Sequence, residues 1–277
     1  MIEKDVCGID GETLDEIYSD TNIESLTLYF YRFENADHPL TSRNNKKITT
    51  MTNLKHLIIY DSSLDIVDTD IYKLQNLIEL DLSELSIKNI PLGISQLINL
   101  KELNLSDLLL KEFPEEITQM IYLEEIRLSK NKIKIIPDNI DNMRSLKVLG
   151  MSQNKIKSIP DGLYNIVGLQ HLYLNYNQIT SISNDLLKLT NLDSLELFQN
   201  HLESFPEDIS SLKNLSNLCL TLNNMSLPKL PSISKHLNFS YGNTIQIHSI
   251  DKYNEVRNEQ MSQFNRDRKK SARQIII

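Results

Sequence analysis

The residues best equipped for chemistry are two cysteines and six histidines, and their spacing limits what they can do. Cys219 and Glu196 lie 23 residues apart, at equivalent points of a repeating pattern, so a thiol nucleophile beside a carboxylate is conceivable. A thiol nucleophile needs a base, and no histidine falls on the two strands expected to flank Cys219. We therefore interpret Cys219 as an ordinary small residue of a strand.

Metal and phosphate chemistry also lack their usual patterns. None of the histidines stands at metal-ligand spacing from a second histidine, a cysteine or a carboxylate set. The seven glycines form neither G-x-x-x-x-G-K nor G-x-G-x-x-G, the loops that cradle phosphates with backbone N–H groups. We predict that the chain is not an enzyme and that it has no cofactor, no metal site and no small-molecule substrate.

Charge and composition limit the kinds of partner and the cellular locations that the sequence predicts. The formal net charge of -8 disfavours nucleic-acid binding, because phosphate backbones attract basic proteins. The first residues, 1–5, carry charges where a signal peptide would be apolar, and no apolar run approaches the ~18 residues of a membrane span. With only two cysteines, the sequence predicts a cytoplasmic protein. The basic run Arg266–Lys270 leaves a nuclear location as the alternative.

The elements that must position any site come from a repeat of 23 residues. Each repeat has the pattern L-x-x-L-x-L-x-x-N-x-L, in which alternate leucines indicate a short strand with one buried face. A later spacing of three, as in Ile94, Leu97 and Leu100, indicates a helical turn. One such unit cannot bury its apolar face alone, so the units must stack. The repeating leucine occurs at Leu54, Leu77, Leu100, Leu123, Leu146, Leu169, Leu192 and Leu215.

Residues 90–100, I-P-x-x-I-x-x-L-x-N-L, resemble the 23-residue intracellular class of leucine-rich repeats, to which Ras-group scaffolds belong. The resemblance covers roughly residues 54–227. It implies an α/β leucine-rich-repeat solenoid, with a curved parallel sheet on the concave face and 3₁₀ or helical segments on the convex face. It also implies an intracellular adaptor. A proline recurs where the convex segment begins, at Pro91, Pro114, Pro137, Pro160 and Pro206.

Three parts of the chain follow from this pattern. We expect an N-terminal cap and irregular first repeat at 1–53, regular repeats at 54–245, and a polar, basic tail at 246–277. In the cap, Thr13 is expected to start a helix, 23–28 to form a strand, and 34–47 to be an insertion.

The ninth position of each repeat should hold an asparagine whose amide bonds backbone groups inside the bend. Asn131 and the four repeats after it keep this residue, whereas Ser62, Leu85 and Leu108 replace it. The N-terminal third must therefore satisfy these groups by other means, and we expect it to be looser.

Counting the repeating leucine as position one, the third, fifth, seventh and eighth positions should line the concave face. The third position carries successive carboxylates at Glu79, Glu102 and Glu125. These carboxylates are open to two interpretations, solubility or attraction of a basic partner. The eighth position is also acidic in the N-terminal coils, at Asp61, Glu84 and Asp107.

Farther along, Tyr173, Tyr176 and Phe198 are expected beside His171 and Glu196. The aromatic residues are explained either by strand propensity or by a binding hot spot.

The predicted function is a non-catalytic protein–protein interaction module, an adaptor or scaffold that binds a protein partner on its concave face. The combination of carboxylates and aromatic rings favours a partner with a basic segment beside an apolar side chain. Two alternatives remain open: a secreted or injected effector, and the targeting subunit of a larger signalling complex. The sequence indicates no oligomeric state and does not identify the partner.

Overall fold

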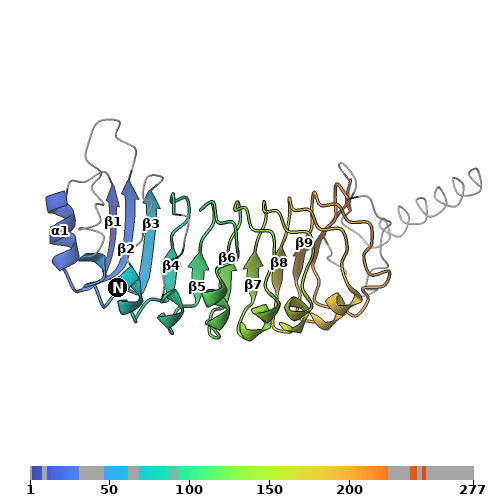
Figure 1. Cartoon of the computed structure of the whole chain (residues 1–277), viewed down its shortest axis with the longest axis horizontal. Helices are drawn as coiled ribbons and strands as arrows, with labels where there is room; N and C mark the ends of the chain where they lie inside the picture. The colour runs from blue at the N-terminus through green and yellow to red at the C-terminus, as the bar shows by residue number, and fades with distance from the viewer. Residues whose placement is uncertain are drawn as a thin grey trace, which may run out of the picture.

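The computed structural model describes residues 2–7, 11–30, 47–61, 69–87, 90, 93–223, 238–241 and 245–247. The strands form one open sheet in which β1 to β12 lie in sequence order (Figure 1). Neighbouring strands are parallel from β1 to β11, and β12 is antiparallel to β11. Most of the predicted insertion at 34–47 and of the predicted tail at 246–277 lies outside the described residues.

The repeats determine where the strands begin and how long they are. Those that follow the 23-residue pattern are mostly three residues long, and each begins at the third position of its repeat. The strands are β1 Ile2–Cys7, β2 Ile23–Phe30, β3 His56–Asp61, β4 Glu79–Asp81, β5 Glu102–Asn104, β6 Glu125–Arg127, β7 Val148–Gly150, β8 His171–Tyr173, β9 Ser194–Glu196, β10 Asn217–Cys219, β11 Asn238–Tyr241 and β12 Ile245–Ile247.

Short 3₁₀ helices return the chain from one strand to the next, and they lie along the lower edge of the solenoid in Figure 1. We call one strand with its returning segment a coil. The 3₁₀ helices are η1 Thr69–Lys73, η2 Ile94–Gln96, η3 Glu115–Gln119, η4 Asp138–Asn142, η5 Asp161–Asn165 and η6 Asn184–Lys188.

The register confirms the leucine pattern. Leu149 pairs with Leu172 and Leu172 with Leu195, so identical repeat positions stand side by side on successive coils. The side chains of Leu172 and Leu174 are fully buried. Each buried leucine contributes on the order of 1.5–3 kcal/mol to the free energy of folding. It is buried by the neighbouring coils, because its own coil has no second layer.

The recurring proline stands at the N-cap of three 3₁₀ helices. Pro114, Pro137 and Pro160 have φ near -70°, and their carbonyls accept the first N–H bonds of η3, η4 and η5. Proline suits this place because its φ is fixed and its missing N–H is not needed. Ser183 replaces it before η6, where its hydroxyl accepts a hydrogen bond from the Asp185 N–H at 3.1 Å.

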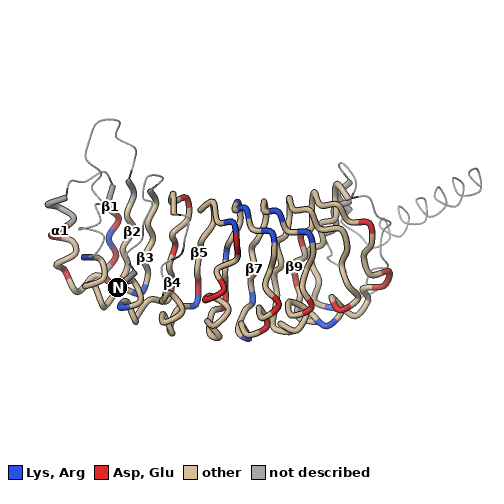
Figure 2. Tube along the Cα trace, viewed as in Figure 1, with Lys and Arg blue, Asp and Glu red and all other residues tan. Residues whose placement is uncertain are grey.

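The two edges of the sheet differ in charge. Figure 2 shows Lys and Arg gathered along the upper edge near β7, whereas the lower edge carries Asp and Glu together with some Lys and Arg. Carboxylates occupy the first turns of η3 to η6, where they face the partial positive charge of a helix start. The acidic edge therefore has a structural cause, whereas the lysines near β7 have no such explanation.

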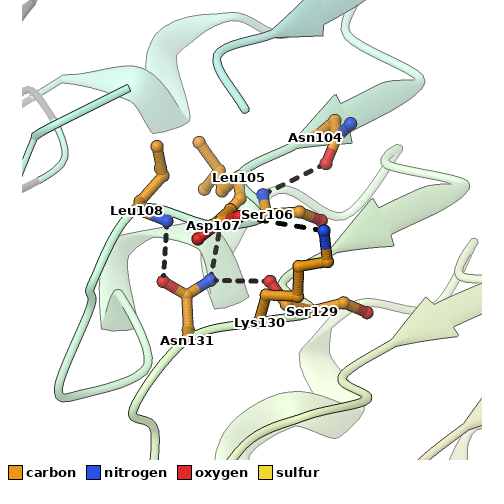
Figure 3. A network of polar contacts seen from close by, with 8 residues as sticks. All are labelled: Asn104, Leu105, Ser106, Asp107, Leu108, Ser129, Lys130 and Asn131. Carbon is orange, nitrogen blue, oxygen red and sulfur yellow. Dashed lines mark hydrogen bonds and ion pairs between the residues drawn. The ribbon is translucent and has the colours of Figure 1, made fainter. Parts of the chain in front are cut away.

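The ninth-position asparagines connect the coils as predicted. Asn177 accepts a hydrogen bond from the Ile156 N–H at 3.0 Å and donates to the carbonyls of Met151 at 2.9 Å and Leu174 at 3.0 Å. One buried amide thus joins its own coil to the preceding one. Figure 3 shows the first of these residues, Asn131, among its partners. The same pattern recurs at Asn131, Asn154, Asn177, Asn200 and Asn223.

A second asparagine ladder, which the sequence analysis missed, runs just before the strands. Asn76 donates to the carbonyl of Thr52 at 2.8 Å, and Asn99 donates to that of Gln75 at 2.8 Å. Each bond spans 24 residues and therefore joins consecutive coils. The ladder consists of Asn53, Asn76, Asn99, Asn191 and Asn214. Tyr122, Ser145 and Gly168 interrupt it in the middle of the chain.

The N-terminal third lacks asparagine at the ninth position. Leu85 and Leu108 are buried at the ninth position and bring no amide. Asp81 and Asn104 instead accept hydrogen bonds from the N–H groups two residues later, at 2.8 Å and 3.1 Å. These bonds go to the Ser83 and Ser106 N–H groups, so the expectation that the groups bonded by the later amides are satisfied by other means stays a prediction. That this third is looser stays a prediction.

The N-terminal cap differs in detail from the prediction. Helix α1 covers Gly11–Ser19, so it begins before Thr13, and the spacing after Thr13 does not mark its start. Strand β1 was not predicted, and it extends the sheet one strand beyond β2. The predicted strand at 23–28 is confirmed within β2.

The first prediction compares the two ladders. We expect Asn177→Ala to lower the free energy of unfolding by roughly 1–3 kcal/mol, because the amide is buried and leaves backbone groups unpaired. Asn191→Ala should cost less than about 1 kcal/mol, since Asn191 is exposed and water can replace its bond to the Val167 carbonyl. Urea unfolding of both variants measures the difference, and equal costs would contradict it.

The second prediction concerns the gap in the second ladder. Tyr122→Asn should donate to the Ile98 carbonyl, 24 residues earlier, as the ladder asparagines do to theirs. The expected gain in unfolding free energy is about 0.5–1 kcal/mol. Tyr122→Ser, which has no amide, is the control. The interpretation is wrong if the asparagine variant is no more stable than the serine variant.

Candidate functional site

The candidate site is the side of the sheet that faces solvent, which we call the strand face. Strand pairing places His56 beside Glu79, Glu79 beside Glu102, and Glu102 beside Glu125. Val148 follows Glu125 in the same row. The row of carboxylates predicted at the third position is therefore continuous over three coils.

The three carboxylates differ in their surroundings. Glu79 Oε2 lies 3.0 Å from His56 Nδ1, and Glu125 Oε1 lies 2.5 Å from Arg127 Nη2. Glu102 is exposed and has no ion pair in the described part of the chain. Glu102 is thus the carboxylate of this row that is most available to a partner.

Glu125 is the least solvated of the three, with 17% of its side chain exposed. Burial raises the pKa of its carboxyl above the ordinary value of 4.5, and the charges of Glu102 and Glu79 add to the rise. The Arg127 guanidinium acts in the opposite direction but does not cancel the rise. The ionised form of Glu125 therefore lowers the free energy of unfolding.

The eighth-position row has a backbone feature that the sequence analysis missed. From Glu84 onward its residues have φ between 52° and 63°, in the left-handed region that non-glycine residues seldom adopt, whereas Asp61 belongs to β3. In this conformation the N–H donates to the next coil, as from Tyr176 to the Phe198 carbonyl at 2.8 Å. The row lies three residues after the end of each three-residue strand, as Tyr176 does after β8, and its side chains stand at the upper margin of the strand face. The row comprises Glu84, Asp107, Lys130, Gln153, Tyr176, Gln199 and Leu222.

The structure arranges the predicted aromatic residues and His171 in two ring pairs on neighbouring coils. The rings of Tyr176 and Phe198 meet edge to face, with centroids 4.8 Å apart. His171 and Tyr173 stack with centroids 6.1 Å apart and an interplanar angle of 8°. Tyr176 is 43% exposed, and the other three rings are partly exposed. We call these four residues the aromatic cluster.

A polar network that was not predicted supports the aromatic cluster. The Glu196 carboxylate accepts hydrogen bonds from the side-chain amides of Asn175 at 2.6 Å and Asn217 at 3.2 Å. Asn217 also donates to the Ser194 hydroxyl at 2.9 Å, and Ser194 is hydrogen-bonded to the Tyr173 hydroxyl. Three coils are thus connected around Glu196, which places this predicted residue within a bonded framework.

The network also affects Tyr173. Burial raises the pKa of the Tyr173 hydroxyl above 10.0, and the Glu196 carboxylate adds to the rise, so the ring stays neutral at physiological pH. Asn175, Ser194 and Asn217 stand at strand-face positions, seven or three, of their repeats. Reading these positions across adjacent coils would have predicted that they meet.

Cys219, the candidate nucleophile of the sequence analysis, lies on the strand face. Cys219 lies beside Glu196 in the sheet, and its Sγ is 3.5 Å from the Thr221 hydroxyl. No group of three or more potential metal ligands occurs within the described ranges. Among the same residues, no helix has the length and apolar character to cross a membrane. The geometry offers rings, carboxylates and amides in fixed rows.

Sequence families match the middle of the chain. The family described as "Leucine rich repeat" matches residues 98–156 and 121–179, and "Leucine Rich repeats (2 copies)" matches residues 167–207. With the 23-residue register and the open stack of coils, these matches identify the chain as a leucine-rich-repeat protein. No curated protein matches the sequence.

Solved structures share the fold. A leucine-rich-repeat protein of Leptospira interrogans is 23% identical with a TM-score of 0.57, over 87% of this chain and 71% of that one. An internalin of Listeria monocytogenes is 22% identical with a TM-score of 0.64, over 83% and 69%. A second internalin of that organism is 22% identical with a TM-score of 0.62, over 84% and 93%. These similarities support the solenoid.

The third prediction tests the cost of the Glu125 charge. Because the folded-state pKa is raised, the wild type loses stability as pH rises through that pKa. Glu125→Gln carries no charge, so it should be more stable than the wild type at about pH 7 and should lose this advantage at about pH 3.5.

Urea unfolding at both pH values measures this difference. Glu102→Gln is the control, because it removes a charge from the same row at an exposed position. An equal gain for Glu125→Gln at the two pH values would contradict a burial effect.

Proposed function

We propose that this chain is a non-catalytic protein-interaction module, an adaptor or scaffold, whose strand face binds a protein partner. Leucine-rich-repeat proteins are generally interaction modules, because a stack of coils offers a long surface of independent side chains. The observation that carries the proposal is the aromatic cluster beside Glu196. In this proposal the protein acts in the cytoplasm, following the resemblance to the intracellular repeat class.

Tyr176 and Phe198 are suited to anchor a partner. They contact each other edge to face, and Tyr176 is 43% exposed, so a partner would bury further aromatic area without first ordering the rings. Aromatic residues usually dominate interface energies, since they supply a large buried surface at a small loss of side-chain entropy. The hydrogen bonds around Glu196 hold the supporting coils in place.

The carboxylates have a different role in this proposal. Glu102 is exposed, whereas Glu79 lies 3.0 Å from the His56 ring nitrogen and Glu125 lies 2.5 Å from the Arg127 guanidinium. Exposed charges act mainly on the rate of encounter with a partner of opposite charge, and screening weakens them beyond about 8 Å at physiological salt. A partner with a basic segment next to an apolar side chain satisfies both regions.

Affinity purification tests the proposal with the intact chain, a Tyr176→Ala, Phe198→Ala double variant and Tyr122→Ala. Tyr122 is the matched control, because it is 56% exposed but precedes β6 at the edge of the sheet. We expect a partner that the intact chain and the control both retain and the double variant loses. If every captured protein binds the double variant equally, the strand face is not the binding site.

The fourth prediction concerns the kinetics of that partner. Tyr176→Ala or Phe198→Ala should raise the dissociation rate at least about tenfold, which corresponds to roughly 1.4 kcal/mol. Glu102→Lys should mainly slow association, and its effect should fade at high salt. Surface plasmon resonance at two salt concentrations separates these effects. A salt-independent loss with Glu102→Lys would contradict the steering role.

A further inference from the structure

A second surface lies at the upper edge of the sheet, where the chain leaves β5, β6 and β7. Five lysines gather there on three successive coils, and all are exposed. They are part of the blue region near β7 in Figure 2. We call them the lysine edge. It consists of Lys111, Lys132, Lys134, Lys155 and Lys157.

The backbone fixes these lysines in a grid. Residues 130–134 alternate between exposed and buried, so Lys132 and Lys134 point to the same side of an extended segment. The Lys132 N–H donates to the Leu110 carbonyl at 2.7 Å, and the Lys155 N–H donates to that of Ile133 at 2.8 Å. Equivalent lysines thus stand on neighbouring coils, with roughly 4.8 Å between coils and about 6.6 Å along each coil.

The lysine edge has no ion-pair partner in the part of the chain that the structure describes. None of its five members forms an ion pair with a described residue. On the opposite edge, by contrast, Lys101 and Lys147 both pair with Glu124, at 3.0 Å and 2.5 Å. Like charges on adjacent strands repel, so the arrangement does not serve stability. An extended anionic partner would relieve the repulsion.

The apolar side chains near the lysines favour one kind of anionic partner, a membrane, over a nucleic acid. Ile135 is 73% exposed and follows Lys134 directly, and Leu109 is 44% exposed on the preceding coil. Exposed aliphatic residues among lysines are typical of surfaces that enter the interface of a bilayer. A single-stranded nucleic acid would favour aromatic or arginine side chains for stacking, and segments 109–112, 130–136 and 153–158 contain neither.

The charge of the opposite edge sets the orientation. The chain as a whole carries -8, and the first turns of η3 to η6 are acidic. A negatively charged membrane would repel that lower edge and attract the upper one within a Debye length of about 10 Å at 0.1 M salt. The solenoid would stand on its upper edge and leave the strand face accessible.

We propose that the lysine edge binds reversibly to membranes that contain anionic lipids, with Ile135 and Leu109 entering the headgroup region. Lysines near such a surface contribute about 1 kcal/mol each to the free energy of membrane binding. Attachment of this kind is peripheral and does not depend on a partner at the strand face. It adds a location on a membrane surface to the proposed role in protein binding.

Vesicle cosedimentation of the full chain tests the proposal. The probes are phosphatidylcholine vesicles with and without roughly one-quarter phosphatidylserine. We expect binding to the anionic vesicles alone. Replacing Lys132, Lys155 and Lys157 together by Gln should weaken this binding about 100-fold.

The matched control replaces Lys147, Lys188 and Lys213 by Gln, which changes the net charge equally at other exposed places. The control should bind like the wild type, and thermal unfolding should show that both triple variants fold. Ile135→Ser should reduce the binding that remains at high salt.

Two results would overturn the proposal. One is equal vesicle binding by the lysine-edge variant and its control, which would assign the attraction to another basic part of the chain, such as Arg266–Lys270. The other is tighter binding to a uridine oligonucleotide than to the anionic vesicles, with loss in the same variant, which would assign the edge to nucleic acid.

Discussion

The constraint on which this structure depends is that no coil can satisfy its own backbone or bury its own leucines. Strands of three residues have too few hydrogen bonds to persist alone, and each coil has a single apolar layer. Both deficits are met by the neighbouring coil, through strand pairing, stacked leucines and asparagine amides such as that of Asn177. Stability therefore resides between repeats, and terminal coils need a cover such as α1 and β1.

The same constraint allows the surface residues to vary. Because leucines and amides hold the coil from inside, outward positions vary without loss of the fold, and the register places them in straight rows. The rows bring together residues that are 23 apart in sequence, as with Glu79 beside Glu102. Residues of neighbouring rows also meet, as with Tyr176 and Phe198, which are 22 apart. One scaffold can thus present an aromatic cluster on one side and a lysine edge on another. The two surfaces can therefore bind different partners.

Sequence reasoning predicted what periodicity determines. The strands, the buried leucines, the prolines before the 3₁₀ helices, the ninth-position asparagines and the third-position row of carboxylates all follow from a fixed spacing. It missed features that depend on geometry around the bend. The left-handed conformation of Tyr176 has no signal in residue type, since glycine or asparagine would be expected there. The bonds of Glu196 to Asn175 and Asn217 required knowing which rows touch. Strand β1 lies outside the repeat, so no period predicted it.

The asparagine ladders also bear on how such a chain can change in length. Their hydrogen bonds between regular coils join residues such as those 21, 24 and 26 positions apart, so each of these bonds assumes one full turn between its ends. An added or deleted residue changes the spacing only of the bonds that span it, and a longer turn can still be bridged, as by the bond from Asn53 to the Thr21 carbonyl, 32 residues earlier. Gain or loss of an entire 23-residue unit leaves all later amides in phase. Duplication can therefore lengthen the sheet in whole steps, and each step adds one new member to every row of the surface.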